Sequence, residues 1–293
     1  MAYIHVEHEK GAEPEFIPLS DTLESSDGTR FNIGRMLWGG KGGNGVVFEA
    51  IREGGMGYKC AIKVLKRLDG QRIDRFNNEI NVLKQLDHEH ISSYLGDGTI
   101  NTRYGDPTPW VAVDLGGPNL RMHVDEHGPL ASAELREIGI QICGALKHLH
   151  ERDFIHRDLK PANFVWTAAN TSNRIMMIDF GLAKRTGENT AGRPFDQFTQ
   201  VGEFVGPVFY SSHELIEYAR DQRTPVDYRS DLFQFGRVMW FLATGTPGAG
   251  IPSHKRDPTG GPLYDLVMQL LPDDPDDRLC DLDLIEDKLK LIS

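Results

Sequence analysis

The sequence predicts an α+β fold in which a strand-rich first part with one main helix precedes a larger, mostly helical second part. Three observations favour this order. Short apolar runs bounded by glycines follow one another after Phe31, as expected of antiparallel strands. One amphipathic helical pattern interrupts these runs, and a longer one follows them, with apolar residues at spacings of three and four.

The first 29 residues differ in composition and hydrophobic pattern from the rest of the chain. They are polar, contain Pro14 and Pro18 and have no sustained hydrophobic period. We interpret residues 1–29 as an N-terminal extension, either a flexible tail or a loosely docked segment. The strands come next, separated by glycine-rich stretches, and are predicted at residues 31–37, 46–52 and 59–65.

Two helices are predicted from apolar spacing. The first carries Phe76, Ile80, Leu83 and Leu86. Another short apolar run, at residues 110–115, ends at Gly-Gly-Pro. The second helix is longer, and one of its faces is formed by Leu135, Ile138, Ile142, Leu146 and Leu149.

Length and composition exclude several classes of protein. The 293 residues suffice for one or two domains with a sizeable core. A formal net charge of −11 argues against nucleic acid as the main partner. No apolar run is long enough to cross a bilayer, no secretory signal is visible, and three widely spaced cysteines fit a reducing compartment. We therefore expect a free-standing cytoplasmic protein without a membrane partner.

A glycine-rich loop precedes the second predicted strand. Residues 40–47 read Gly-Lys-Gly-Gly-Asn-Gly-Val-Val and fit the pattern G-x-G-x-x-G-x-V. Glycines let a backbone lie close to a polyphosphate. A dinucleotide-binding loop should open a helix, and a P-loop needs Ser or Thr after Gly-Lys, so neither pattern fits. From the loop alone, a flexible hairpin without a ligand remains an alternative.

The third predicted strand ends in Cys-Ala-Ile-Lys, which places Lys63 after a small apolar wall. A lysine ammonium can hold the α- and β-phosphates of a nucleotide. Because lysine is flexible and strongly hydrated, it needs a carboxylate to fix its position. Glu79, on the predicted first helix, can supply that carboxylate. The alternative for Glu79 is a solvated charge on the helix surface.

Two segments that each contain one aspartate follow the long helix. Residues 156–163 read His-Arg-Asp-Leu-Lys-Pro-Ala-Asn and offer a proton acceptor, a cation and an oxygen ligand for magnesium in Asp158, Lys160 and Asn163. A second apolar run then ends in Asp179-Phe-Gly, whose carboxylate suits a further magnesium ligand. A single aspartate is more often a turn residue or a helix cap, but that alternative does not explain both segments together.

These motifs, in this order, resemble those of the protein kinase superfamily, from about Phe31 to the C-terminus. Residues 86–91 match the family's Leu-x-His-x-x-Ile stretch. Asp231 is similar to its buried aspartate on helix F, and Glu214 and Arg278 are similar to its structural ion pair. The resemblance implies a eukaryotic-like serine/threonine protein kinase.

The resemblance implies a two-lobed protein-kinase fold, with a kinase domain at residues 30–293. Its small antiparallel N-lobe would span about 30–115 and its larger, mostly helical C-lobe about 116–293. ATP and Mg²⁺ (or Mn²⁺) are the implied cofactors, with Asn163 and Asp179 as metal ligands. The implied catalytic residues are Asp158, Lys160, Lys63 and Glu79. The implied ATP-binding residues are Gly40, Gly42, Gly45, Val47, Ala61, Lys63, Val113, Asp114, Leu115 and Val165.

Two positions depart from the family pattern. The family's Ala-Pro-Glu is Ser-His-Glu here, which keeps the carboxylate of Glu214. Pro207 stands where serine/threonine kinases usually have a threonine, and proline has neither a hydroxyl nor an N–H. This departure affects peptide docking rather than ATP binding. Lys160 has the serine/threonine pattern rather than the tyrosine pattern, and we give it more weight because it touches the chemistry.

The resemblance also implies protein substrates and autophosphorylation in trans. Arg157 precedes the predicted base, and kinases with that pair usually need an anion on the activation segment. Thr199 could supply it by phosphorylation, or Glu203 as a fixed carboxylate. The alternative is that Glu203 is a solvated loop residue. A binding scaffold without activity and a small-molecule kinase are the competing functions.

Overall fold

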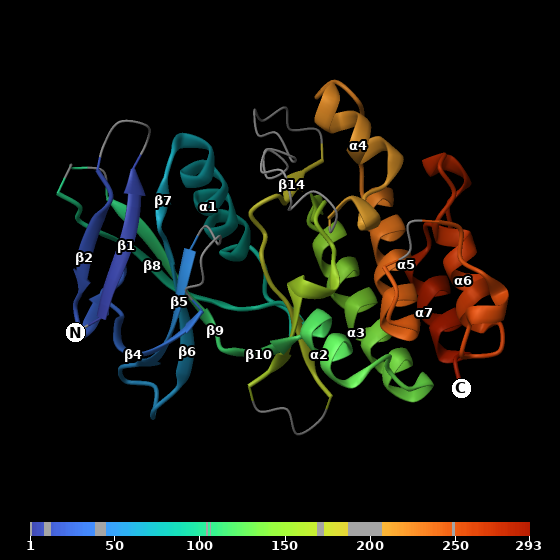
Figure 1. Ribbon diagram of the computed structural model, residues 1–293, viewed down its shortest axis with the longest axis horizontal. Helices are drawn as coiled ribbons and strands as arrows, with labels where there is room; N and C mark the ends of the chain where they lie inside the picture. The colour runs from blue at the N-terminus through green and yellow to red at the C-terminus, as the bar shows by residue number, and fades with distance from the viewer. Residues whose placement is uncertain are drawn as a thin grey trace. The chain divides into compact units, whose positions relative to one another are not determined.

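The computed structural model describes residues 2–8, 13–38, 45–103, 105, 107–168, 173–186, 207–247 and 250–293. The chain divides into two compact units (Figure 1). Unit 1 consists of Met1–Asp87 with Ser92–Gly116, and unit 2 of His88–Ile91 with Gly117–Ser293. Strands predominate in unit 1 and helices in unit 2, which confirms the predicted α+β order.

A six-stranded antiparallel sheet forms the centre of unit 1. The three strands predicted from the glycine-bounded runs are confirmed, and the apolar run at 110–115 is a strand as well. In sheet order the strands are β3 (Thr22–Glu24), β4 (Arg30–Trp38), β5 (Gly45–Arg52), β6 (Lys59–Leu65), β9 (Thr108–Asp114) and β8 (Tyr94–Ile100).

The N-terminal residues form a second, smaller sheet. Strands β1 (Ala2–His8) and β2 (Glu15–Leu19) pair as an antiparallel hairpin, and β1 also pairs in parallel with β7 (Arg67–Leu68). The interpretation of residues 1–29 as a tail or loosely docked extension is therefore wrong for its described part. Pro18 favoured that interpretation because proline is typical of loops. However, β2 is an edge strand, where a proline need not remove a hydrogen bond between strands.

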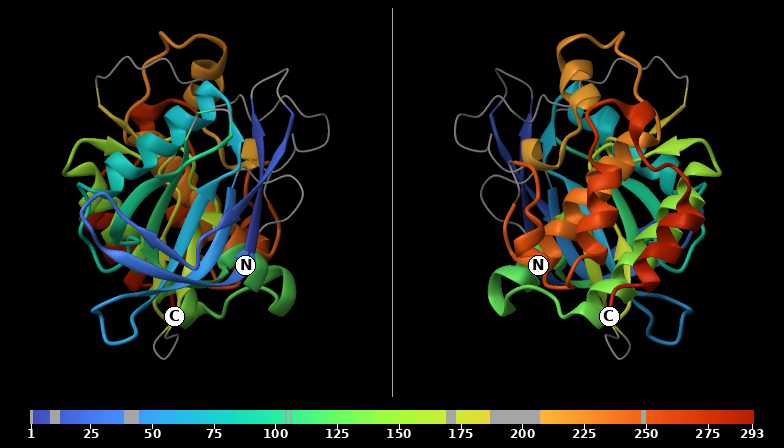
Figure 2. Two further views of the ribbon diagram at one scale, coloured as in Figure 1. Left: turned by 90° about the vertical axis from the view of Figure 1, so that its left-hand side faces the viewer. Right: turned by 90° about the vertical axis from the view of Figure 1, so that its right-hand side faces the viewer.

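One hydrophobic core unites the N-terminal hairpin, the sheet and helix α1 (Gly70–Leu83). The hairpin contributes Ile4, Val6, Ile17 and Leu19, all buried. Figure 2 (left) views unit 1 from the side of this hairpin, drawn in dark blue. The predicted first helix is confirmed, but it ends before Leu86, which is buried beyond the last turn.

Helices that pack against one another predominate in unit 2. The predicted long helix is confirmed as α3 (Ser132–His150), whose five predicted apolar residues have no exposed surface. The other α-helices described are α2 (Leu120–His127), α4 (His213–Arg220), α5 (Arg229–Thr244), α6 (Pro262–Leu270) and α7 (Leu282–Lys290). Single 3₁₀ turns are η1 (Pro161–Asn163), η3 (Pro207–Tyr210), η4 (His254–Arg256) and η5 (Pro275–Asp277). No helix among the described residues has the length and apolarity that spanning a membrane requires.

Two small sheets hold the segments between these helices. One has the order β10 (Gly116–Asn119), β12 (Phe164–Thr167) and β13 (Ile175–Met177). The other pairs β11 (Phe154–Ile155) with β14 (Lys184–Arg185). The segment that holds Asp158 and Asn163 therefore lies between β11 of one small sheet and β12 of the other.

A buried ion pair joins α4 to the segment after α6. The Arg278 guanidinium donates to both carboxylate oxygens of Glu214, at 2.6 and 2.9 Å. Ser230 Oγ donates to the same carboxylate, at 2.6 Å. The other N–H groups of Arg278 donate to backbone carbonyls, those of Pro272, Arg229 and Asp273. Every donor of this arginine is thus satisfied although its side chain is fully buried.

Two opposing effects set the pKa of Glu214. Burial raises it, but the hydrogen bonds from Arg278 and Ser230 outweigh burial, so the pKa lies below its ordinary value. A depressed folded-state pKa contributes stability above the unfolded-state pKa of about 4.5. That contribution is lost as the pH falls through the folded-state pKa.

We expect Arg278→Ala to lower the free energy of unfolding by about 3–5 kcal/mol at pH 7, because it leaves a buried charge without its partner. Removing the side chain of the exposed Lys290, which pairs with Glu286 on α7, should lower the free energy of unfolding by less than about 1 kcal/mol. Urea denaturation measures both.

The dependence of stability on acidic pH gives a second test of the Glu214–Arg278 pair. The stability difference between wild type and Glu214→Gln should shrink as the pH falls below about 4.5, because the Glu214 carboxylate of the unfolded chain takes up its proton at a higher pH than that of the folded chain. A difference that stays constant down to pH 3 would contradict this role of the ion pair.

Candidate active site

One face of the sheet in unit 1 carries the residues predicted to bind the nucleotide. Ala61 and Lys63 are two positions apart on β6 and so point to the same face. Strand register places Val47 opposite Lys63 and Val113 opposite Ala61. Three small apolar side chains therefore surround one lysine on this face.

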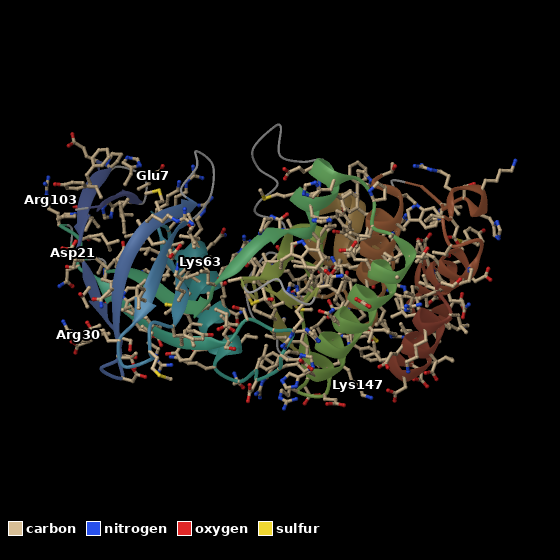
Figure 3. All side chains as sticks on the ribbon, turned by 90° about the horizontal axis from the view of Figure 1, so that it is seen from below. Glu7, Asp21, Arg30, Lys63, Arg103 and Lys147 are labelled. Atoms are coloured by element: carbon tan, nitrogen blue, oxygen red, sulfur yellow. The ribbon has the colours of Figure 1, made fainter. Side chains whose placement is uncertain are left out.

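Lys63 and Glu79 form a close ion pair. The Lys63 ammonium donates to both carboxylate oxygens of Glu79, at 2.9 and 2.7 Å. The Glu79 side chain is 8% exposed and that of Lys63 is 30% exposed (Figure 3 labels Lys63). The ammonium also lies 5.7 Å from the centre of the Phe76 ring, one turn before Glu79 on α1. The alternative of Glu79 as a solvated surface charge is excluded by its burial.

Two further residues predicted to bind the nucleotide, Gly45 and Asp114, have defined surroundings in unit 1. A Cβ at Gly45 would lie 2.9 Å from the carbonyl oxygen of Val64, so only glycine fits there. Asp114 accepts hydrogen bonds from the Tyr58 hydroxyl at 2.5 Å and the Ser93 N–H at 3.0 Å. The hydrogen bond to Asp114 and burial raise the pKa of Tyr58 to about 12.

Other predicted residues lie elsewhere or outside the described part. Leu115 follows Asp114 after the end of β9 and is partly buried. Val165 belongs to unit 2, where it is buried on β12. Gly40 and Gly42 lie outside the described residues.

Unit 2 brings Asp158, Lys160 and Asn163 together. The Lys160 ammonium donates to Asp158 Oδ2 at 2.7 Å. The Asn163 amide nitrogen donates to the Asp158 carbonyl at 2.8 Å and to its Oδ2 at 3.2 Å. A carboxylate placed between a cation and an amide can accept a proton from a hydroxyl. We call these three residues the Asp158 cluster.

The buried Asp231 on α5 holds the backbone of this segment. Its two carboxylate oxygens accept hydrogen bonds from the N–H groups of His156 and Arg157, at 2.9 and 2.8 Å. Arg157 needs this support, since its φ of 65° is in the left-handed region that side chains other than glycine avoid. His150 Nε2 lies 2.9 Å from the same carboxylate.

Two further residues that contact this carboxylate or this backbone segment were not predicted from the sequence. Gln234, one turn after Asp231, accepts from the Leu159 N–H at 3.1 Å and donates to the Arg157 carbonyl at 3.3 Å. His150 is the other. The signal that could have found Gln234 is a polar residue within the otherwise apolar stretch 232–236.

Asp179 follows β13 with a φ of 68°, a second left-handed residue near the predicted site. The Ile178 N–H donates to the Asn163 carbonyl at 2.8 Å, which ties this segment to the Asp158 cluster. Phe180 is fully buried, with its ring 5.2 Å from that of His156. Burial lowers the pKa of His156, so its imidazole is neutral beneath the cluster.

The donor set of Asn163 and Asp179 fits a magnesium ion. The Asn163 amide uses its nitrogen towards Asp158, which leaves its oxygen as the atom for a cation. Asp179 adds a charged carboxylate from the adjoining segment. Oxygen ligands of this kind are those that Mg²⁺ and Mn²⁺ prefer.

A basic cavity of about 380 Å³ lies in unit 2 beside Arg157. The Arg157 guanidinium donates through Nε to the Leu182 carbonyl at 2.8 Å and lies 5.5 Å from the Tyr218 ring centre. Other cationic residues lining the cavity are Lys184, Arg185 and Arg223. The regulatory candidates Thr199 and Glu203 lie outside the described residues.

In comparison with known protein families, residues 35–288 match the protein kinase domain. The chain is 31% identical over 245 residues to a probable serine/threonine-protein kinase PknB of Corynebacterium glutamicum, covering 80% of this chain and 35% of that protein. It is 31% identical over 222 residues to serine/threonine-protein kinase PknB of Mycobacterium leprae, covering 74% and 33%. The chain thus spans about a third of the length of the curated relatives it matches.

We expect Asp231→Asn to loosen the segment around Arg157, because an amide has one oxygen where the carboxylate had two acceptors for buried N–H groups. The free energy of unfolding should fall by about 1–3 kcal/mol, the cost of a buried group left unsatisfied. Amide hydrogen exchange at His156 and Arg157 measures the local effect.

The exposed Asp221, which pairs with Arg223 at the end of α4, provides the matched control. Asp221→Asn should leave exchange at His156 and Arg157 unchanged. Protection at Arg157 that survives Asp231→Asn would show that Asp231 does not hold this backbone.

Proposed function

The chain belongs to the protein kinase family, and from that premise we propose that it transfers the γ-phosphate of ATP to serine or threonine side chains of protein substrates. The observation that carries this proposal is the Asp158 cluster, in which a carboxylate, an ammonium and an amide converge within hydrogen-bond distance. These are the groups that phosphoryl transfer to a hydroxyl needs on the side of the acceptor.

In the proposed reaction, Asp158 orients the substrate hydroxyl and accepts its proton. The hydroxyl oxygen forms a bond to the γ-phosphorus, and the bond from that phosphorus to the β–γ bridging oxygen breaks. Lys160, 2.7 Å from Asp158, adds positive charge beside the group in transfer. Bound Mg²⁺ (or Mn²⁺) would neutralise phosphate charge, with Asn163 and Asp179 as the residues that hold it.

Unit 1 supplies the groups for the nucleotide. Lys63, fixed by both oxygens of Glu79, is placed to bind the α- and β-phosphates. The apolar side chains of Val47, Ala61 and Val113 share its face of the sheet and suit an adenine ring. The other residues proposed for ATP are Gly40, Gly42, Gly45, Asp114, Leu115 and Val165.

We extend the proposal to partners and location. Protein substrates include a second copy of the chain, which would be phosphorylated in trans. The cysteines of the chain, Cys60, Cys143 and Cys280, carry free thiols, which supports a reducing compartment such as the cytoplasm.

Regulation through Arg157 forms the last part of the proposal. A cavity lined by Arg157, Lys184 and Arg185 attracts an anion. Phosphorylated Thr199 or the carboxylate of Glu203 would supply that anion and order the activation segment. A carboxylate carries one charge and a phosphate nearly two, so Glu203 alone should give partial activity.

We expect Asp158→Asn to reduce phosphotransfer about 10²–10⁴-fold, the range for loss of a positioned acid–base group. ATP affinity should stay close to that of wild type, because Asp158 faces the acceptor rather than the nucleotide. Transfer of labelled phosphate and ATP titration calorimetry measure the two quantities, with Asp287→Asn on the exposed face of α7 as control.

Each competing function has its own outcome in that assay. Wild type that binds ATP without transferring phosphate would be a scaffold. Wild type that phosphorylates small molecules but no protein would be a small-molecule kinase. Asp158→Asn with most of its activity retained would remove Asp158 from the mechanism.

We expect Glu203→Ala to lower the activity of dephosphorylated protein about 5-fold, as a coupling of about 1 kcal/mol to Arg157 implies. In an Arg157→Ala background the same substitution should have little further effect. Glu203→Ala that matches dephosphorylated wild type would refute the built-in anion. Loss of activity in Thr199→Ala alone would instead identify phosphorylation as the switch.

A further inference from the structure

The N-terminal hairpin is joined to the connection that leads into α1. The Glu7 N–H donates to the Lys66 carbonyl at 2.7 Å, and β1 pairs in parallel with β7 in the register Glu7 to Arg67 and His8 to Leu68. The Glu7 carboxylate also lies 3.0 Å from Arg67 Nε. Backbone and side chain of one residue therefore hold the same short strand.

That short strand runs directly into the first turn of α1. β7 ends at Leu68, and Asp69 caps the helix by accepting a hydrogen bond from the Arg72 N–H at 3.1 Å. The Ile73 N–H donates to the Asp69 carbonyl at 3.0 Å. Because cap and strand are adjacent, fixing β7 fixes the position at which α1 starts.

The hairpin also packs in the same core as the helix itself. Ile4 and Val6, on the inner face of β1, share a hydrophobic cluster with Phe76 and Ile80 of α1. Glu79 stands between Phe76 and Ile80 in sequence, so these two side chains determine the rotation of the helix that carries it. Figure 3 labels Glu7 on β1 and Lys63 on β6.

We propose that the β1–β2 hairpin holds α1 at the position and rotation where Glu79 reaches Lys63, so that Val6, Glu7 and Arg67 are positioning residues for phosphoryl transfer. The proposal rests on the proposed function of the Lys63–Glu79 pair. It follows from two observations: β1 holds the start of α1 through β7, and Ile4 and Val6 of β1 belong to the hydrophobic cluster that contains the buried face of α1. A shift of about 1 Å in a positioned group can cost a reaction about 100-fold, so a helix held at both places matters for the rate.

The Glu7–Arg67 pair separates positioning from general stability. Its side chains are 40% and 22% exposed, and ion pairs this exposed contribute little to the stability of a fold. An effect on turnover much larger than the effect on melting temperature therefore indicates positioning. Unit 1 contains a matched pair, Arg30 with Glu53 at 3.5 Å, at the start of β4 and away from α1.

The test is a charge-reversal cycle in the full chain. Glu7→Arg and Arg67→Glu should each lower kcat about 3- to 10-fold and speed amide exchange of residues 76–83 by a similar factor, with Tm little changed. The double reversal should restore both quantities to within about 2-fold of wild type. Arg30→Glu and Glu53→Arg, and Tyr3→Ala on the exposed face of β1, should change neither.

Val6→Ala provides a variant independent of charge and should speed exchange of α1 as well. Unchanged exchange of residues 76–83 in Glu7→Arg, Arg67→Glu and Val6→Ala would overturn the proposal. So would a double reversal as impaired as the two single changes combined. Wild type without phosphotransfer would refute the proposed function instead, and exchange of α1 would still decide whether the hairpin holds the helix.

Discussion

The candidate site in unit 2 depends on one buried carboxylate, that of Asp231. A carboxylate without exposed surface is unfavourable unless donors surround it, and here two backbone N–H groups and His150 do so. In return, the His156 and Arg157 backbone is held in a conformation that Arg157 would not adopt by itself. The position of Asp158, the next residue, follows from that turn.

Unit 1 uses a buried carboxylate in a different way. Glu79 fixes a side chain rather than a backbone, because Lys63 has a long flexible stem and would otherwise sample many rotamers. Both carboxylates belong to helices with apolar buried faces, α5 and α1, so helix packing sets where each oxygen lies. The two arrangements share one principle, since a rigid helix positions a charge and the charge positions a mobile group.

Long periodic patterns and short motifs made much of this predictable from sequence. The strands β4–β6 and the helix α3 have strong periods, and Lys63, Glu79, Asp158 and Asn163 stand in motifs with fixed spacing. The N-terminal hairpin was not predictable in this way. Its strands alternate over only a few residues, Pro18 mimics a loop signal, and β1 becomes a central strand only by pairing with β7, a partner of two residues far along the chain. The roles of Gln234 and His150 are likewise set by tertiary contacts that no local pattern contains.

The pairing of β1 with β7 also has a consequence for how unit 1 folds. Glu7 finds its partner Arg67 60 positions later, so this contact closes a long loop and belongs to the slow class of non-local pairings. During synthesis at about 5–20 residues per second, β1 and β2 wait roughly 3–12 s for β7 to be made. In that interval the core that receives Ile4, Val6, Ile17 and Leu19 is incomplete, because its members on α1 and β9 are made later. The first strands of the sequence are therefore made before the segment that completes their sheet, and in this interval their apolar side chains are open to chaperone binding or aggregation.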